Sequence, residues 1–143
     1  MRIEFQRRRT PFRKDNWTPR AIEVFATAKV IATPGLITTE HLVLAMEASD
    51  TVASRAFKKL GLIPSAALGR CAPSQLCQDA DLFMQDFVGT LGRDLQALTI
   101  KESRSRNWSY LGTDGLLLAL ATLGVPGIQL PYERVNEIIN ECR

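Results

Sequence analysis

Histidines and paired cysteines, from which many metal and nucleophilic sites are built, are nearly missing from this sequence. Among 143 residues there is one histidine, His41, and there are three cysteines, Cys71, Cys77 and Cys142, with no CxxC pair. A single histidine supplies neither a catalytic pair nor a ligand cluster for a metal. An odd number of scattered thiols suits a reducing compartment better than a disulfide framework. We therefore expect no catalytic residue, no metal, no cofactor and no enzymatic activity.

Long apolar runs are also lacking. No stretch approaches the roughly 20 residues that span a bilayer, and the first residues do not form the apolar core of a secretory signal. The composition, 45% hydrophobic and 23% charged, is that of a globular domain. The sequence thus predicts one domain without a membrane span. We expect it in the cytoplasm, or in the plastid stroma if the source is a plant or an alga.

Acidic residues are scarce at the start of the chain. Residues 1–20 contain seven arginines and lysines against Glu4 and Asp15, which gives this segment a net charge of +5. The whole chain carries +3, so the remainder is at −2 and the basic pI describes a tail rather than a basic domain. We expect residues 1–15 to form a basic, flexible tail. Nucleic acid is accordingly a disfavoured partner.

Helical periodicity runs through the rest of the chain, whereas strand-type alternation is nowhere sustained. Thr18 and Thr39 are placed to cap helices, and a proline follows Thr18 at a first helical position. In the fifth expected helix, Gly89 and Gly92 allow a bend or a late start. Helices are expected within residues 17–35, 38–48, 51–61, 64–69, 83–104, 112–124 and 130–142.

One motif occurs twice. Residues 36–46 read LITTEHLVLAM and residues 110–120 read YLGTDGLLLAL, an offset of 74 positions that aligns Glu40 with Asp114. Both copies place an acid in the first turn of an expected helix and follow it with a wide apolar face. The second copy has Gly115 where the first has a histidine. Self-similarity of this length predicts two stacked helical units that share one core.

Together with TPRAIEVFATAK and ASRAFKKLGL, the doubled motif resembles the N-terminal domain of Clp ATPases over residues 16–142. The resemblance implies an all-α fold of about seven or eight helices, in which two pseudo-symmetric repeats pack as one bundle. The first repeat would span residues 16–70, the joint residues 71–81 and the second, shorter repeat residues 82–142. Because GxxxxGK[ST] does not occur, the chain looks like a free-standing domain of this kind without the ATPase module.

The same resemblance nominates ligand-binding residues. In family members that recognise phosphorylated arginine, the motif acid faces the guanidinium group and a helix-start threonine assists with the phosphate. Carried over to this sequence, this gives Glu40 with Thr18 in the first repeat and Asp114 in the second. The alternative is that these residues only cap and polarise their helices. For His41 we expect a role in helix packing.

Three aromatic residues, Trp17, Trp108 and Tyr110, flank the two motifs. They are either core anchors or part of a peptide-binding groove between the repeats. Our hypothesis is a non-enzymatic adaptor or accessory protein of the Clp protease system, which binds a protein substrate, a degradation tag, or a Clp ATPase or protease subunit. The alternative is a small nucleic-acid-binding protein that acts through the arginine-rich tail.

Overall fold

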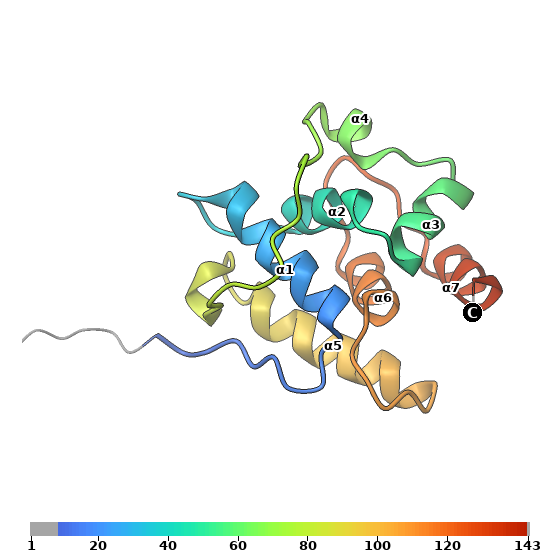
Figure 1. Cartoon of the computed structure of the whole chain (residues 1–143). Coiled ribbons are helices and arrows are strands. Elements are labelled where there is room, and N and C mark those ends of the chain that lie inside the picture. Colours follow the sequence, from blue (N-terminus) through green and yellow to red (C-terminus); the bar gives the residue numbers. More distant parts are fainter. Residues whose placement is uncertain (1–8, 143) are drawn as a thin grey trace, which may run out of the picture.

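The described part of the chain folds into seven α-helices and one short 3-10 helix (Figure 1). The computed structural model describes residues 9–142, and this range contains no β-strand. The prediction of an all-α bundle with about seven helices is confirmed. The helices are α1 (Pro19–Ala32), α2 (Thr39–Ala48), α3 (Val52–Lys59), α4 (Pro64–Leu68), η1 (Met84–Asp86), α5 (Leu91–Ser105), α6 (Thr113–Leu123) and α7 (Tyr132–Glu141).

Capping groups define the starts of the first two helices. At α1 the hydroxyl of Thr18 accepts a hydrogen bond from the backbone N–H of Ala21 at 3.2 Å. At α2 the cap is Thr38 rather than the expected Thr39, because the backbone N–H of Thr38 donates to Nδ1 of His41 at 3.0 Å. His41 thus takes the place that a glutamate or glutamine has in a capping box.

The fifth α-helix starts later than the apolar spacing alone would place it. Phe83 and Phe87 flank η1, and α5 begins only at Leu91. In the turn between η1 and α5, Gly89 has a φ of 52°, a left-handed conformation that glycine adopts without strain. The late start that the glycines allow is therefore what the structure shows. It leaves Phe87 outside the helix, where its side chain is buried in the core.

The segment that precedes α1 pairs with the segment that precedes α6. The backbone N–H of Leu111 donates to the carbonyl of Asn16 at 2.7 Å, and the N–H of Thr18 donates to the carbonyl of Leu111 at 2.8 Å. These two bonds form a short parallel contact between segments that are far apart in the sequence. They tie the first helix of one repeat to the second helix of the other.

An equivalent contact joins the segments that precede α2 and α5. The N–H of Ile37 donates to the carbonyl of Asp86 at 2.8 Å, and the N–H of Val88 donates to the carbonyl of Ile37 at 3.0 Å. Since Ile37 and Leu111 are 74 positions apart, the offset of the repeat, the two parallel contacts are related by pseudo-twofold symmetry. Their register makes Val88 the counterpart of Thr18.

α2 and α6 are the central helices of the bundle. α2 packs against α1, α3 and α4, and α6 packs against α1, α3, α5 and α7. Residues 42–46 of α2 and residues 113–120 of α6 are all buried. A helix that is buried on every side needs apolar residues on every side, which explains the wide apolar faces of both motif copies. Burial of this surface is the main driving force for the packing.

Close packing of α5 on α6 explains why the second motif copy has a glycine. A Cβ atom at Gly115 would lie 3.1 Å from Cγ2 of Thr99 and 3.3 Å from Oγ of Ser103, two residues of α5. In a core of native packing density, even a methyl group here would force these neighbours to move. The aligned position of the first copy has room for the ring of His41. The missing histidine is thus a packing requirement.

The second repeat is one helix shorter than the first. After α2 the chain forms α3 and α4, whereas after α6 it forms α7 alone. α7 packs against α6 and also against α3 of the first repeat. Its residues Val135, Ile138 and Ile139 are fully buried on this side. The two repeats therefore share one hydrophobic core.

Residues 9–15, expected to belong to a flexible tail, are packed against the bundle. Phe12 is only 3% exposed, and its ring centroid lies 4.8 Å from that of Phe25 and 5.0 Å from that of Phe87. The expectation is wrong for this segment, because the burial of one aromatic side chain outweighs the repulsion between neighbouring basic residues. The first part of the expected tail, residues 1–8, lies outside the described residues.

The expected joint, residues 71–81, contains no helix and passes across α1 (Figure 1). The buried hydroxyl of Thr27, on α1, accepts a hydrogen bond from the backbone N–H of Cys77 at 2.9 Å. Lys14 and Asp79 form an ion pair at 2.6 Å. The segment is therefore held on the surface of the first helix by defined contacts.

Phe12→Ala should lower the free energy of unfolding by about 3–5 kcal/mol, because it leaves a cavity among buried aromatic rings. Urea-induced unfolding measures this change. Arg13→Ala is the matched control, since the side chain of Arg13 is exposed, and it should change the stability by no more than about 0.5 kcal/mol. Equal, small effects of both substitutions would show that the segment before α1 does not contribute to the core.

Candidate ligand-binding site

Two of the three expected ligand-binding residues line one cavity. Thr18 and Asp114 border a space of about 450 Å³ where several helices begin. They come from different repeats, and the hydrogen bonds between the segments before α1 and α6 bring them together. Glu40, which the resemblance pairs with Thr18, does not line this space. We call it the helix-start cavity; its charged and hydroxyl-bearing lining residues are Thr18, Arg20, Asp50, Thr51, Arg55, Tyr110, Thr113 and Asp114.

Three helices direct their N-termini at the helix-start cavity. Thr18 is the N-cap of α1, Thr51 that of α3 and Gly112 that of α6, and all three residues line the cavity. The N–H groups of the first turn carry a partial charge of about +0.5 per helix. Part of it is already met within the chain, because Thr18 accepts from Ala21 and Asp114 accepts from Gly115. A ligand with an anionic group is therefore favoured here.

Arg20 and Arg55 add two positive charges to the helix-start cavity, and the exposed carboxylate of Asp50, the partner of Arg55, lines it too. Nη1 of Arg20 lies 3.5 Å from Oε1 of Glu23, and Nη1 of Arg55 lies 3.7 Å from Oδ1 of Asp50. Both arginines are exposed, and exposed ion pairs of this kind contribute little to stability. The guanidinium groups are therefore able to turn towards a ligand at small cost.

Asp114 is the buried acid of the helix-start cavity. It is 4% exposed, and its Oδ1 accepts a hydrogen bond from the backbone N–H of Gly115 at 2.8 Å. Burial raises the pKa of Asp114, and hydrogen bonds from backbone N–H groups and the charge of Arg106 offset this only in part. A desolvated carboxylate in this state gains from a cationic ligand group, such as a guanidinium, that pairs with its charged form.

Glu40 occupies the pseudo-symmetric position, in the first turn of α2. Its Oε2 lies 4.0 Å from Nη1 of Arg70, an arginine that follows α4. The counterparts of Thr18 and Tyr110 at this position are Val88 and Leu36, which are 44% and 48% exposed. The two pseudo-symmetric positions are therefore chemically different: one is a charged cavity with hydroxyl groups, and the other an acid beside exposed aliphatic side chains.

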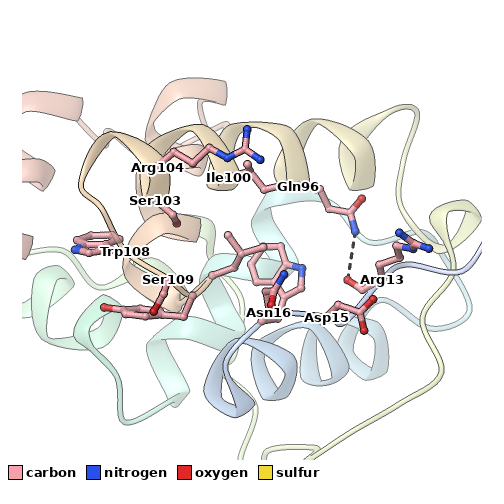
Figure 2. Close-up of a pocket in the computed structure, with 12 residues that line it drawn as sticks. Arg13, Asp15, Asn16, Gln96, Ile100, Ser103, Arg104, Trp108 and Ser109 are labelled. Atoms are coloured by element: carbon pink, nitrogen blue, oxygen red, sulfur yellow. Dashed lines mark hydrogen bonds between the residues drawn. The ribbon is translucent and has the colours of Figure 1, made fainter.

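The three expected groove residues line a second cavity, of about 410 Å³, between α5 and the segment before α1 (Figure 2). Trp17 is also part of the core, with its ring edge-on to that of Phe25 at 4.9 Å. Trp108 and Tyr110 are only partly buried, and their rings lie within 8° of parallel with centroids 6.0 Å apart. We call this space, lined by Trp17, Trp108 and Tyr110, the aromatic cavity. Tyr110 also lines the helix-start cavity.

His41 lines neither cavity. Burial lowers the pKa of His41, the charge of Arg70 lowers it further, and the charge of Glu40 opposes both. The neutral imidazole is the form that can accept the hydrogen bond from Thr38 through Nδ1. The helix-packing role expected for His41 is thus more specifically a capping role.

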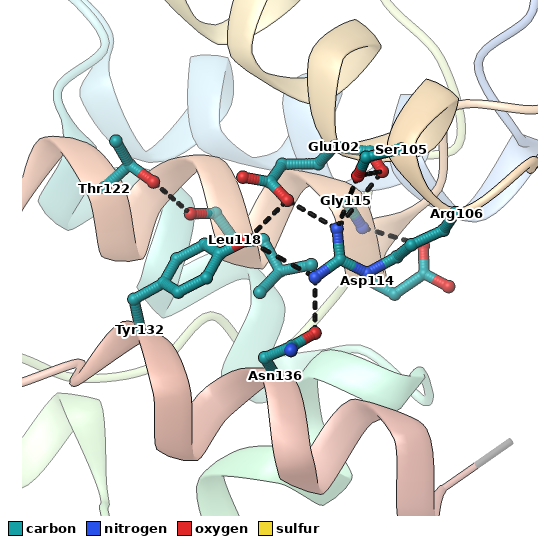
Figure 3. A network of polar contacts seen from close by, with 9 residues as sticks. All are labelled: Glu102, Ser105, Arg106, Asp114, Gly115, Leu118, Thr122, Tyr132 and Asn136. Carbon is teal, nitrogen blue, oxygen red and sulfur yellow. Dashed lines mark hydrogen bonds and ion pairs between the residues drawn. The ribbon is translucent and has the colours of Figure 1, made fainter.

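A polar network that the sequence analysis did not identify fixes the end of α5 (Figure 3). Arg106 donates to Oε2 of Glu102 at 2.5 Å, to the hydroxyl of Tyr132 at 3.3 Å and to Asn136. The Tyr132 hydroxyl also donates to Glu102, at 2.6 Å. The Arg106 guanidinium lies 5.5 Å from the ring centroid of Trp108, so the network supports the wall of the aromatic cavity. Only the i,i+4 spacing of Glu102 and Arg106 could have indicated it.

The basic residues near the N-terminus are described only in part. The guanidinium of Arg9 lies 5.1 Å from the ring centroid of Phe83, and Lys14 is paired with Asp79. Residues 1–8, which include three further arginines, lie outside the described residues. The nucleic-acid hypothesis depends on this arginine-rich segment and gains no support from these contacts.

Comparisons with known proteins do not identify a family. The chain matches no protein-family model, and a search of curated proteins found no match. Within residues 9–142, no helix is both long and apolar enough to cross a membrane. Functional inference therefore rests on the doubled motif and on the two cavities.

His41→Ala should lower the free energy of unfolding by about 0.5–1.5 kcal/mol at a pH well above 6.5, because the N–H of the cap residue Thr38 loses its acceptor. The pKa of His41 in the folded protein lies below its ordinary value of 6.5. The contribution of the neutral ring is therefore complete above 6.5 and is lost as the pH falls through the folded-state pKa. Urea unfolding at several pH values should show the two stability curves converging on acidification. A gap that stays constant would contradict capping by the neutral imidazole.

Proposed function

We propose that this protein is a non-enzymatic adaptor or accessory protein of the Clp protease system, which binds protein substrates through a degradation tag. The resemblance of the doubled motif to Clp N-terminal domains supports the assignment to this system. The observation that carries the proposal is the helix-start cavity, where a buried carboxylate, an exposed one, two arginines and three helix starts line one space.

A phosphorylated arginine side chain matches the charges of this cavity. Its guanidinium group is the complement of Asp114, because a carboxylate can accept two parallel charge-assisted hydrogen bonds from it. Its phosphoryl group suits Arg20, Arg55 and the N–H groups at the helix starts, with the hydroxyl of Thr18 as a further donor. One ligand would thereby satisfy both the acidic and the basic part of the lining.

The groups of the cavity suit binding rather than bond cleavage. The one histidine of the chain, His41, caps α2 and does not line the cavity, so it is not placed to act as a general base on a bound tag. Arginine and threonine side chains hold a phosphoryl group by hydrogen bonds and charge. We therefore assign recognition, not hydrolysis, to the site.

The asymmetry of the repeats favours a tag site at Asp114. Glu40 remains the second candidate acid; its neighbour Arg70 supplies one cationic group, but the counterparts of Thr18 and Tyr110 there are the exposed aliphatic residues Val88 and Leu36. The position of Glu40 therefore offers fewer polar groups to a phosphate than the helix-start cavity does.

Asp114→Asn should weaken the binding of free phosphoarginine about tenfold or more, measured by calorimetry, because a charge-assisted interaction becomes a neutral one. The substitution keeps an oxygen that can accept from the N–H of Gly115, so α6 should stay intact. Glu40→Gln is the matched control and should leave the affinity unchanged. Binding that depends on Glu40 and not on Asp114 would move the tag site to the other pseudo-symmetric position.

The purified chain should form a complex with the Clp ATPase or the Clp protease of its own organism, detected by co-elution in size-exclusion chromatography. It should also accelerate the degradation of an arginine-phosphorylated model substrate by these partners. Absence of a complex together with an unchanged degradation rate would refute the assignment to the Clp system, whatever the outcome of the tag-binding measurement.

A further inference from the structure

The aromatic cavity is a second candidate site, which the tag-binding proposal does not use. One of its walls is formed by Gln96, Ile100 and Ser103 of α5, and the opposite wall by residues of the segment before α1 (Figure 2). The loop that leads into α6 closes it with Trp108 and Tyr110. A volume of about 410 Å³ is within the range of sites that hold small ligands or a few side chains.

Ser103, on α5, also borders the aromatic cavity, and it is only 2% exposed. Its side chain extends from α5 towards the side on which Asn16 and Ser109 lie (Figure 2). Its Oγ is not accessible to solvent and lies against α6, 3.3 Å from where a Cβ atom of Gly115 would be. We therefore assign no ligand contact to this hydroxyl. Gln96 and Asn16 contribute side-chain amides to the same lining.

The aromatic wall is partly exposed and supported from behind. Trp108 and Tyr110 lie nearly parallel, and the guanidinium of Arg106, which the polar network holds, lies 5.5 Å from the ring centroid of Trp108. Preorganised aromatic side chains lose little entropy when a ligand packs on them. Partly exposed tryptophan, tyrosine and arginine are also the residue types that dominate binding energy at protein interfaces.

The charge of the lining favours an acidic ligand. Arg13 and Arg104 are exposed at the cavity, against the single carboxylate of Asp15. Attraction to the two arginines is therefore available to one or two carboxylates. The presence of Asp15 in the same wall disfavours a continuous run of phosphates, as in a nucleic-acid strand.

We propose that the aromatic cavity binds a short peptide segment in which an aromatic residue is flanked by acidic residues. The aromatic side chain packs against Trp108 and Tyr110, and the acidic side chains pair with Arg13 and Arg104. This inference rests on the proposed role in substrate binding, to which it adds a sequence preference beside the tag. Since Tyr110 borders both cavities, one substrate segment can reach both of them.

The test uses the purified chain and acetylated peptides with the sequence Gly-Asp-Phe-Asp-Gly, measured by calorimetry and by tryptophan fluorescence. Replacing both Asp residues of the peptide by Lys, or its Phe by Ala, should weaken binding about tenfold or more. On the protein side, Arg104→Glu should weaken binding of the acidic peptide to a similar extent. Arg134→Glu, which reverses an exposed charge on α7 away from the cavity, is the matched control and should have no effect.

Several results would overturn the proposal: equal affinities of Arg104→Glu and Arg134→Glu, equal affinities of the three peptides, or tighter binding of an oligothymidylate than of the acidic peptide. Trp108→Ala should reduce the fluorescence change to the contribution of Trp17, which lines the same cavity. The charge-reversal pair keeps the test valid if that variant does not fold. Binding of phosphoarginine serves as a parallel measurement. A chain that binds phosphoarginine but not the peptide would refute this inference alone, whereas the opposite result would refute only the tag site.

Discussion

The backbone hydrogen bonds that Leu111 makes with Asn16 and Thr18 determine where the two cavities of the proposed sites lie. They place the start of α1 beside the start of α6, so that a threonine of one repeat and an acid of the other line the same cavity. α3 packs on α6 and adds a third helix start to this cavity. The aromatic cavity depends on the same contact, because its walls include both of the segments that the contact joins.

The two motif copies differ for reasons of packing and of chemistry. Gly115 permits a close approach of α5 and α6, whereas His41 completes the cap of α2. Around these positions one copy borders charged and hydroxyl groups, and the other borders the exposed side chains of Val88 and Leu36. A shared apolar core conserves the fold of both repeats while their helix starts remain free to differ.

Most of the fold could be predicted from the sequence, because threonine caps, prolines and apolar spacing act locally along the chain. The placement of Thr18 and Asp114 in one cavity could not be predicted, because the backbone hydrogen bonds that create it have no side-chain signature. The burial of Phe12 was missed because the basic residues around it suggested a solvated tail. The Arg106 network was missed because it joins α5 to α7, and only tertiary packing brings these side chains together.

The position of Tyr110 in the walls of both cavities has a thermodynamic consequence. If a ligand in one cavity changes the orientation or mobility of this ring, it changes the affinity of the other cavity, and the coupling must be reciprocal. Two weak contacts on the same chain segment would also reinforce each other through their high effective concentration. A single side chain would then allow the protein to distinguish a substrate that fills both cavities from one that fills either alone.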